Sequence, residues 1–189
     1  MADSKLGPFL QALEGALGDV VFKHYGRKIV ISRKPNFQNR VFSVAQKESQ
    51  EYFKEAGRYA RAAKANPEVW QAYSDEAKAS AKAPRCIAIR DFLNPPRVTE
   101  VDLRLYNGRA EDKILVLATD DSGVTKVEVA VLNAQGDIVE KGLAENAGGN
   151  LWAYVATVSI DEGSVVKIEA TAFDRPGHSG NLQKRFEAK

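Results

Sequence analysis

The chain has 189 residues and a mass of 20.7 kDa, and it is 44% hydrophobic and 28% charged. This length suits one large or two small domains, and the composition excludes a wholly disordered, collagenous or membrane-spanning chain. The net charge of +2 conceals an asymmetry, because residues 1–97 carry 17 Lys and Arg against 10 Asp and Glu (+7), whereas residues 98–189 carry 10 against 15 (−5).

The first two predicted elements are a short helix and a hairpin. Apolar residues recur at three- and four-residue spacing from Leu6 to Leu17, which predicts an amphipathic helix that ends near Gly18. Two β-rich runs between Val20 and Ser32, separated by a turn that contains Gly26, predict a β-hairpin. An isolated hairpin is only marginally stable, so this one needs a packing partner.

Helix signals follow from Ser43 onward. Ser43 and Gln46 match a capping box, which predicts a helix of about twenty residues that ends at Asn66. The run Asn66-Pro67-Glu68 is a second start signal, and a third short helix is expected over residues 85–93. Because Pro95-Pro96 cannot continue a helix, we expect a linker at 95–97 between a basic helical domain (1–94, with the hairpin at about 20–32) and a second domain (98–189).

The second half has the two-residue period of β-strands. Short runs rich in Val, Ile, Thr and aromatic residues alternate with clusters of turn residues. The predicted strands cover 98–105, 113–118, 124–132, 137–142, 151–160, 165–173 and 182–186. Seven short strands in about ninety residues are typical of an immunoglobulin-like sandwich. The expected fold class is therefore α+β, with N-terminal helices and a hairpin followed by an antiparallel β-sandwich.

Two turn motifs in this half carry a resemblance. Residues 118–124 have the pattern A-x-D-x-x-G-V, and residues 172–178 repeat A-x-D-x-x-G with His178 in the last place. Residues 98–189 thereby resemble the bacterial immunoglobulin-like domains of surface, phage and adhesion proteins, which usually have Asn where this chain has His178. The whole chain also resembles a group of uncharacterised bacterial proteins with a helical front and such a sandwich. The resemblance implies a fold but no activity, because this fold serves many functions.

Basic residues concentrate between residues 20 and 66, where eleven Lys and Arg face three acids. At 100° per residue, part of this set forms one stripe of the first long helix, opposite an alanine-rich face. The stretch is either a binding surface for phosphates or an acidic partner, or an ordinary solvated face. The candidate partner- or phosphate-binding residues are Lys23, Arg27, Lys28, Arg33, Lys34, Lys47, Lys54, Arg58 and Arg61.

A nucleic-acid function has one further basis. Lys34-Pro35, a helix, and the run from Asn66 through Trp70 and Tyr73 resemble the end of an HMG box, which bends DNA from the minor groove. An HMG box needs two helices between the Lys-Pro signal and the tryptophan, however, and this chain has room for one long helix. The alternative role for Trp70 and Tyr73 is a hydrophobic seam between helices.

The acidic turns offer a candidate cation site. Asp120, Asp121 and Asp174 follow outgoing strands and are expected to meet at one end of the sandwich, where their carboxylates could bind calcium. Each aspartate also has a sufficient structural role in capping its own turn, which we favour because the spacing of a calcium loop is absent. The two histidines, His24 and His178, lack neighbouring ligands at zinc spacing.

Motifs for catalysis and cofactors are absent from the sequence. There is no nucleophile elbow, phosphate-binding loop or dinucleotide fingerprint, so we expect no enzyme activity and no cofactor. The single cysteine, Cys86, lies in an apolar run and is expected to be a small buried residue. Because a disulfide needs two cysteines, a single cysteine excludes an intrachain disulfide.

Localisation follows from the same kind of evidence. No apolar run reaches the length of a membrane span, and the first residues lack the pattern of a signal peptide, so we expect cytoplasmic synthesis without membrane insertion. Release by lysis or through a dedicated injection machine would leave no trace in the sequence.

These observations lead to two functional hypotheses. The first is a non-enzymatic structural or interaction protein that self-associates, with the basic front of one copy packing on the acidic sandwich of the next, as a subunit of a bacterial or phage-related assembly or filament. The alternative is a nucleic-acid-binding protein that uses the basic helical domain.

Overall fold

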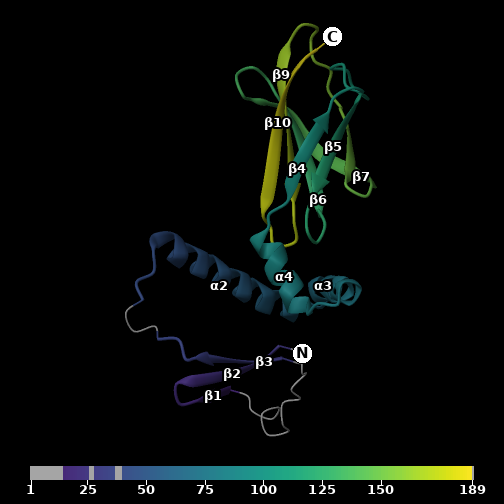
Figure 1. The fold of residues 1–189 in the computed structure, drawn as a ribbon. Coiled ribbons are helices and arrows are strands. Elements are labelled where there is room, and N and C mark those ends of the chain that lie inside the picture. Colours follow the sequence, from purple (N-terminus) through teal and green to yellow (C-terminus); the bar gives the residue numbers. More distant parts are fainter. Residues whose placement is uncertain (1–14, 26–27, 37–39, 189) are drawn as a thin grey trace, which may run out of the picture. The chain divides into compact units, whose positions relative to one another are not determined.

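The computed structural model describes residues 15–25, 28–36 and 40–188 (Figure 1). The chain divides into two compact units, Met1–Val44 and Ala45–Lys189. Among the described residues, no helix is both long enough and apolar enough to cross a membrane.

The first unit contains a three-stranded antiparallel sheet in the order β1 (Gly15–Leu17), β2 (Val20–Tyr25) and β3 (Lys28–Arg33). The predicted hairpin is confirmed, since Val20 pairs with Arg33 and Tyr25 with Lys28.

The predicted first helix is wrong at its C-terminal end, where the chain forms β1. Gly18, at φ +60°, forms a two-residue turn with Asp19, and this turn pairs Leu17 with Val20. The apolar spacing of the segment therefore did not determine its structure, because a glycine turn placed its last residues in the sheet. Residues 6–14 of the predicted helix lie outside the described residues.

Three helices begin the second unit: α2 (Val44–Ala65), α3 (Pro67–Ser80) and α4 (Pro84–Leu93). The predicted start of α3 is confirmed, because the Asn66 side chain accepts hydrogen bonds from the backbone N–H groups of Glu68 and Val69, with Pro67 in the first turn. Their shared core consists of Ala60, Ala63, Tyr73, Ala77, Ile87 and Ala88, with Trp70 packed against it. The seam expected at Trp70 and Tyr73 is thus present.

Seven antiparallel strands form the rest of this unit as a nearly closed β-sandwich, which confirms the expected fold class. They are β4 (Arg97–Asp102), β5 (Lys113–Thr119), β6 (Lys126–Leu132), β7 (Ile138–Gly148), β8 (Leu151–Val155), β9 (Val165–Phe173) and β10 (Ser179–Glu187), in the spatial order β10-β9-β6-β7-β8-β5-β4. The first part of β7 pairs with β6 and its end pairs with β8, so β7 crosses from one sheet to the other. Lys184 on β10 donates to the Val101 carbonyl of β4 over 2.8 Å and connects the two end strands.

The sandwich core follows the predicted alternation of residues. Val127, Val129 and Val131 of β6 are fully buried, whereas Lys126 and Glu128 point to the other face. Trp152, Ile114 and Ile168 contribute large side chains from β8, β5 and β9 to the same core.

The predicted linker at Pro95-Pro96 lies inside the second unit, and Pro96 is buried. The Cβ of an alanine at Gly180 on β10 would collide with the Pro96 carbonyl oxygen. The chain therefore enters the sandwich in close backbone contact with its last strand. The division into domains 1–94 and 98–189 stays a prediction.

Candidate functional site

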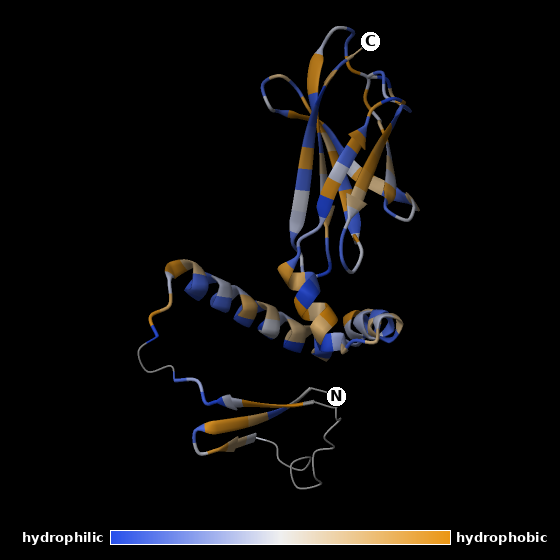
Figure 2. Cartoon of the chain, viewed as in Figure 1, coloured by the Kyte–Doolittle hydropathy of each residue, from blue (hydrophilic) through white to orange (hydrophobic). Residues whose placement is uncertain are grey.

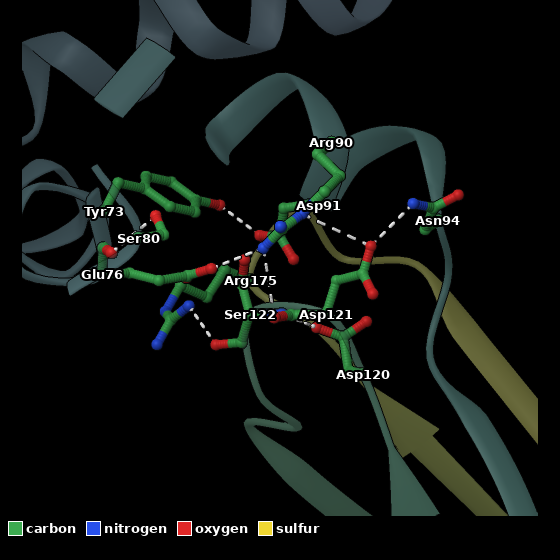
Figure 3. Close-up of polar contacts among 10 residues, drawn as sticks. All are labelled: Tyr73, Glu76, Ser80, Arg90, Asp91, Asn94, Asp120, Asp121, Ser122 and Arg175. Carbon is green, nitrogen blue, oxygen red and sulfur yellow. Dashed lines mark hydrogen bonds and ion pairs between the residues drawn. The ribbon is translucent and has the colours of Figure 1, made fainter. Parts of the chain in front are cut away.

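Polar side chains gather where the helices meet one end of the sandwich. Helix α4 leads directly into β4, so its C-terminus lies beside the turns that follow β5 and β9. We call this cluster the polar junction. Its members are Tyr73, Glu76, Arg90, Asp91 and Asn94 from the helices and Asp120, Asp121, Ser122, Asp174 and Arg175 from the turns, most of which Figure 3 shows.

Asp91 is the buried acid of the polar junction. It is 0% exposed, its Oδ2 accepts a hydrogen bond from the Tyr73 hydroxyl, and its Oδ1 has no protein partner. Burial raises the pKa of Asp91 to about 7, with a further increase from Asp120 and Asp174, while the hydrogen bond from Tyr73 and the charge of Arg175 act in the opposite direction. Asp91 is thus protonated at mildly acidic pH and changes charge near neutrality.

Two tyrosines extend this hydrogen-bond chain away from Asp91. The Tyr59 and Tyr73 hydroxyls lie 2.7 Å apart, and their rings meet edge to face. Burial is the main cause that raises the pKa of both phenols, so they stay protonated as donors. The guanidinium of Arg175 lies 5.5 Å from the centre of the Tyr73 ring and connects the helical core to the turn after β9.

Charged contacts hold the helices to the turn after β5. Arg90 of α4 lies 2.6 Å from Glu76 of α3 and 3.4 Å from Asp121. Asn94 donates a 2.7 Å hydrogen bond to Asp121 Oδ2, the same oxygen that Arg90 contacts. Figure 3 shows these side chains converging from both parts of the unit. Ion pairs that are only partly exposed are screened less by salt than those on an open surface.

Of the three predicted calcium ligands, Asp120 and Asp174 lie close enough to Asp91 to raise its pKa, whereas Asp121 contacts Arg90 and Asn94. Asp120 accepts from the backbone N–H of Ser122, and Asp174 accepts from those of Gly177 and His178, so both cap their own turns. Burial is the main cause that raises the pKa of Asp174. Within the described residues, no group of three or more His, Cys, Asp or Glu side chains is placed to hold a metal ion. Calcium binding stays a prediction, beside an observed role in turn capping.

His178 belongs to the same end of the sandwich. Its Nδ1 lies 3.3 Å from Asp174 Oδ2, and its ring meets that of Phe92 edge to face at 4.6 Å. The residue is therefore a packed part of the helix–sandwich contact as well as a turn residue. The side chain of His24 is outside the described part of the chain.

The basic stripe of α2 is present as predicted. Lys47, Lys54, Arg58 and Arg61 are all exposed, and Ala56, Ala60 and Ala63 on the opposite side are buried. Lys54 is partly neutralised by Glu51, 2.5 Å away. The exposed residues of the stripe without such an acidic contact among the described ion pairs are Lys47, Arg58 and Arg61.

The remaining basic candidates lie in the first unit. Lys23 and Arg33 are exposed on β2 and β3, and Lys34 follows them. Lys28 is on β3, although its side chain is not described, and Arg27 lies outside the described residues. They form a group separate in sequence from the stripe of α2.

The expectation for Cys86 is wrong, because its side chain is exposed. In α4 the packed positions are Ile87, Ala88 and Asp91, and Cys86 falls outside them. An apolar run in a helix does not predict burial of every residue in it, because only one side of the helix packs against the core.

Sequence reasoning missed the Tyr73–Asp91 pair. A signal was available, since Asp91 falls on the buried face of α4, three and four residues after Ala88 and Ile87. An aspartate in such a position needs a buried donor. The identity of that donor depended on how α3 packs against α4.

Comparisons with known proteins yield matches to solved structures only. No family model and no curated protein matches the chain. CopC from Methylosinus trichosporium OB3b is 13% identical, with a TM-score of 0.38, over 50% of this chain and 93% of CopC. An engineered protein is 20% identical, with a TM-score of 0.39, over 50% of this chain and 20% of that one. β-Glucuronidase from Ruminococcus gnavus is 20% identical, with a TM-score of 0.28, over 49% of this chain and 16% of the enzyme. The matches to CopC and to the β-glucuronidase lie in the C-terminal half.

Proposed function

We propose that this protein is a non-enzymatic interaction protein that self-associates, as a subunit of a bacterial or phage-related assembly. The observation that carries the proposal is that apolar side chains of the three-stranded sheet β1–β3 are exposed. Among the residues of 15–44 whose side chains are described, none is buried, and Leu17 and Ile31 are 69% and 60% exposed. A small sheet gains stability by burying an apolar face, so this one favours a partner surface.

Charge supports a second copy as that partner. Residues 15–44 contain six Lys and Arg against one acid, Asp19, while residues 98–189 have a net charge of −5. Opposite charges on different parts of one chain favour contact between copies, and each copy offers both halves of that contact. A head-to-tail contact of this kind extends into a filament or closes into a ring, depending on the rotation between copies.

The test is the mass of the purified protein in solution. Size-exclusion chromatography with light scattering, over a range of concentrations at low salt, is expected to give masses above the 20.7 kDa of one chain. High salt should reduce the mass at a given concentration, because it screens the attraction between exposed charges. A single-chain mass at every concentration and salt level would contradict the proposal.

The alternative function, nucleic-acid binding, has the exposed stripe of α2 in its favour. Phosphate contacts by Lys47, Arg58 and Arg61 would make binding weaken steeply as salt rises. A gel-shift titration with duplex DNA and with RNA tests it, comparing Arg58→Glu/Arg61→Glu with a control on the sandwich, Lys113→Glu/Lys167→Glu. No shift of the wild-type chain at low salt excludes this function.

A further inference from the structure

One outer face of the sandwich is apolar where a sheet in water is normally polar. The inward residues of β5 are Ile114, Val116 and Ala118, yet Leu115 and Leu117 point outward and are partly exposed. The neighbouring strand β8 continues the pattern, with Trp152 and Tyr154 inward and with Leu151, Ala153 and Val155 outward. Strands that are apolar on both sides are typical of sheets covered on both faces.

The other sheet gives an internal comparison. Strand β6 places Lys126 and Glu128 on its outer side, and β9 places Lys167 and Glu169 there. That face also has apolar outward residues, Leu132, Leu143 and Phe173 among them, but they alternate with these charged side chains. The strip on β5 and β8 differs because Leu115 pairs with Ala153 and Leu117 with Leu151, with no charged residue between them.

Charged side chains border this apolar strip, with the basic residues Arg97 and Lys113 at its two ends and acidic residues along its sides. Glu100 on β4 pairs in register with Leu117, and Glu145 on β7 pairs with Ala153. Asp102 also lies on this side of β4, where Arg104 binds it through both carboxylate oxygens. Glu100 and Glu145 are exposed, one on each side of the strip. We call this surface, made of the outward residues of β4, β5 and β8 together with Glu145, the acceptor face.

The small sheet of the first unit has matching features. Registry places Leu17, Val20, Phe22 and Ile31 on one side of it, because Leu17 pairs with Val20 and Phe22 with Ile31. Arg33 pairs with Val20 and lies on the same side. Lys34 follows directly. This side, the donor face, is thus an apolar strip with a basic end, and the hydropathy colours of Figure 2 show the apolar residues of β2 and β3.

We propose that the acceptor face of one copy binds the donor face of a second copy. The inference rests on the self-association proposed above and assigns its contact. Two apolar sheet faces pack about 10 Å apart with their side chains interdigitated. Such packing would cover Leu17 and Ile31 on one copy and Leu115 and Leu117 on the other, with Arg33 and Lys34 near the glutamates at the border.

Charge reversal on both faces tests the assignment. Glu100→Lys/Glu145→Lys changes the acceptor face, and Arg33→Glu/Lys34→Glu changes the donor face. All four side chains are exposed, so the fold should persist, which circular dichroism checks. Each double variant is expected to weaken association at least tenfold in light-scattering titrations, and the quadruple variant should recover most of the loss because the charges are complementary again.

A matched control and an apolar variant complete the experiment. Glu162→Lys/Glu187→Lys makes the same change in net charge at exposed positions outside the acceptor face and should leave association within about twofold of wild type. Ile31→Lys should abolish association by placing a charge in the apolar contact.

The outcomes separate the two proposals. A wild-type chain that associates while all reversed variants associate equally well overturns the assigned contact and leaves self-association standing. Equal weakening by the control and the acceptor variant, or no recovery in the quadruple variant, also overturns the assigned contact. If the wild-type chain is monomeric at every concentration and salt level, both the self-association and the assigned contact are overturned. This holds also if the donor face packs on the sandwich of its own chain.

Discussion

At the scale of single residues, the most consequential side chain is Asp91. A carboxyl group that is removed from water is more stable in its neutral form, and the nearby carboxylates of Asp120 and Asp174 reinforce this preference. The Tyr73 hydroxyl compensates only one of its two oxygens. Asp91 therefore links α4 to α3 through a hydrogen bond whose acceptor has a raised pKa.

The pH dependence follows from the direction of this shift. The folded pKa of Asp91, about 7, is above its ordinary value of 3.8, so between these values the folded state binds a proton that the unfolded state has lost. The contribution of Asp91 to the free energy of unfolding is then largest at low pH and falls as pH rises from about 4 to 7. We expect Asp91→Asn, which does not ionise, to remove this part of the decline, as measured by urea denaturation at pH 5, 6, 7 and 8.

The control for this experiment is Asp75→Asn. Asp75 is exposed, and its hydrogen bond from Lys78 lowers its pKa, so it stays ionised throughout that pH range. Its variant should keep the wild-type slope of stability against pH. If Asp91→Asn also keeps that slope, the assigned titration of Asp91 is incorrect.

At the scale of elements, the two sheets are held together where β7 changes partner. Tyr154 of β8 packs over Gly142, where an alanine Cβ would lie 2.7 Å from the ring carbon Cε2. The Tyr154 hydroxyl donates to the buried Glu140, which also accepts from the backbone N–H and the hydroxyl of Thr157. A glycine here lets the ring approach the backbone of β7 and complete this network.

Substitution of two glycines tests this account of packing. Gly142→Ala should lower the free energy of unfolding by about 1–3 kcal/mol, since the ring of Tyr154 has to move. Gly57→Ala, in α2 with nothing within 4 Å of the added methyl group, should raise it by about 0.5–1 kcal/mol through helix propensity. Urea denaturation monitored by tryptophan fluorescence measures both. Equal effects of the two changes would contradict the close approach at Gly142.

At the scale of the whole molecule, the two units differ in how much they bury. The second unit has two hydrophobic cores, one among the helices and one in the sandwich. In the first unit, the described side chains of 15–44 include none that is buried. Regions with few buried contacts open with a low free energy and exchange their amide hydrogens quickly.

Amide hydrogen-exchange rates should therefore differ between the two units. In dilute solution at high salt, we expect the amides of β2 and β3 to exchange much faster than those of β6 and β9. At low salt and high protein concentration, exchange in β2 and β3 should slow, because association covers the donor face. Protection of β2 and β3 equal to that of β9 in the dilute sample would show that the small sheet is already packed within one copy.

Much of the local structure was predictable because it depends on neighbouring residues. The start of α3 at Asn66-Pro67 and the alternation of Val127, Val129 and Val131 are local effects of capping and of strand period. The strand at Gly15–Leu17 was not predictable from apolar spacing, because pairing with β2 decided it. In the candidate site, the turn caps of Asp120 and Asp174 followed from their motifs, whereas the partner of Asp91 did not.

Local residue patterns specify the order of helices and strands in the second unit, the glycine turns and the separation of charge between the two halves, so these features could be predicted from the sequence. The packing of α4 on the turns of the sandwich, the contact of Tyr73 with Asp91 and the position of Leu115 and Leu117 between Glu100 and Glu145 became visible only in the folded chain. These contacts join residues far apart in the chain. Strand registry and helix packing specify them, and both depend on the whole core.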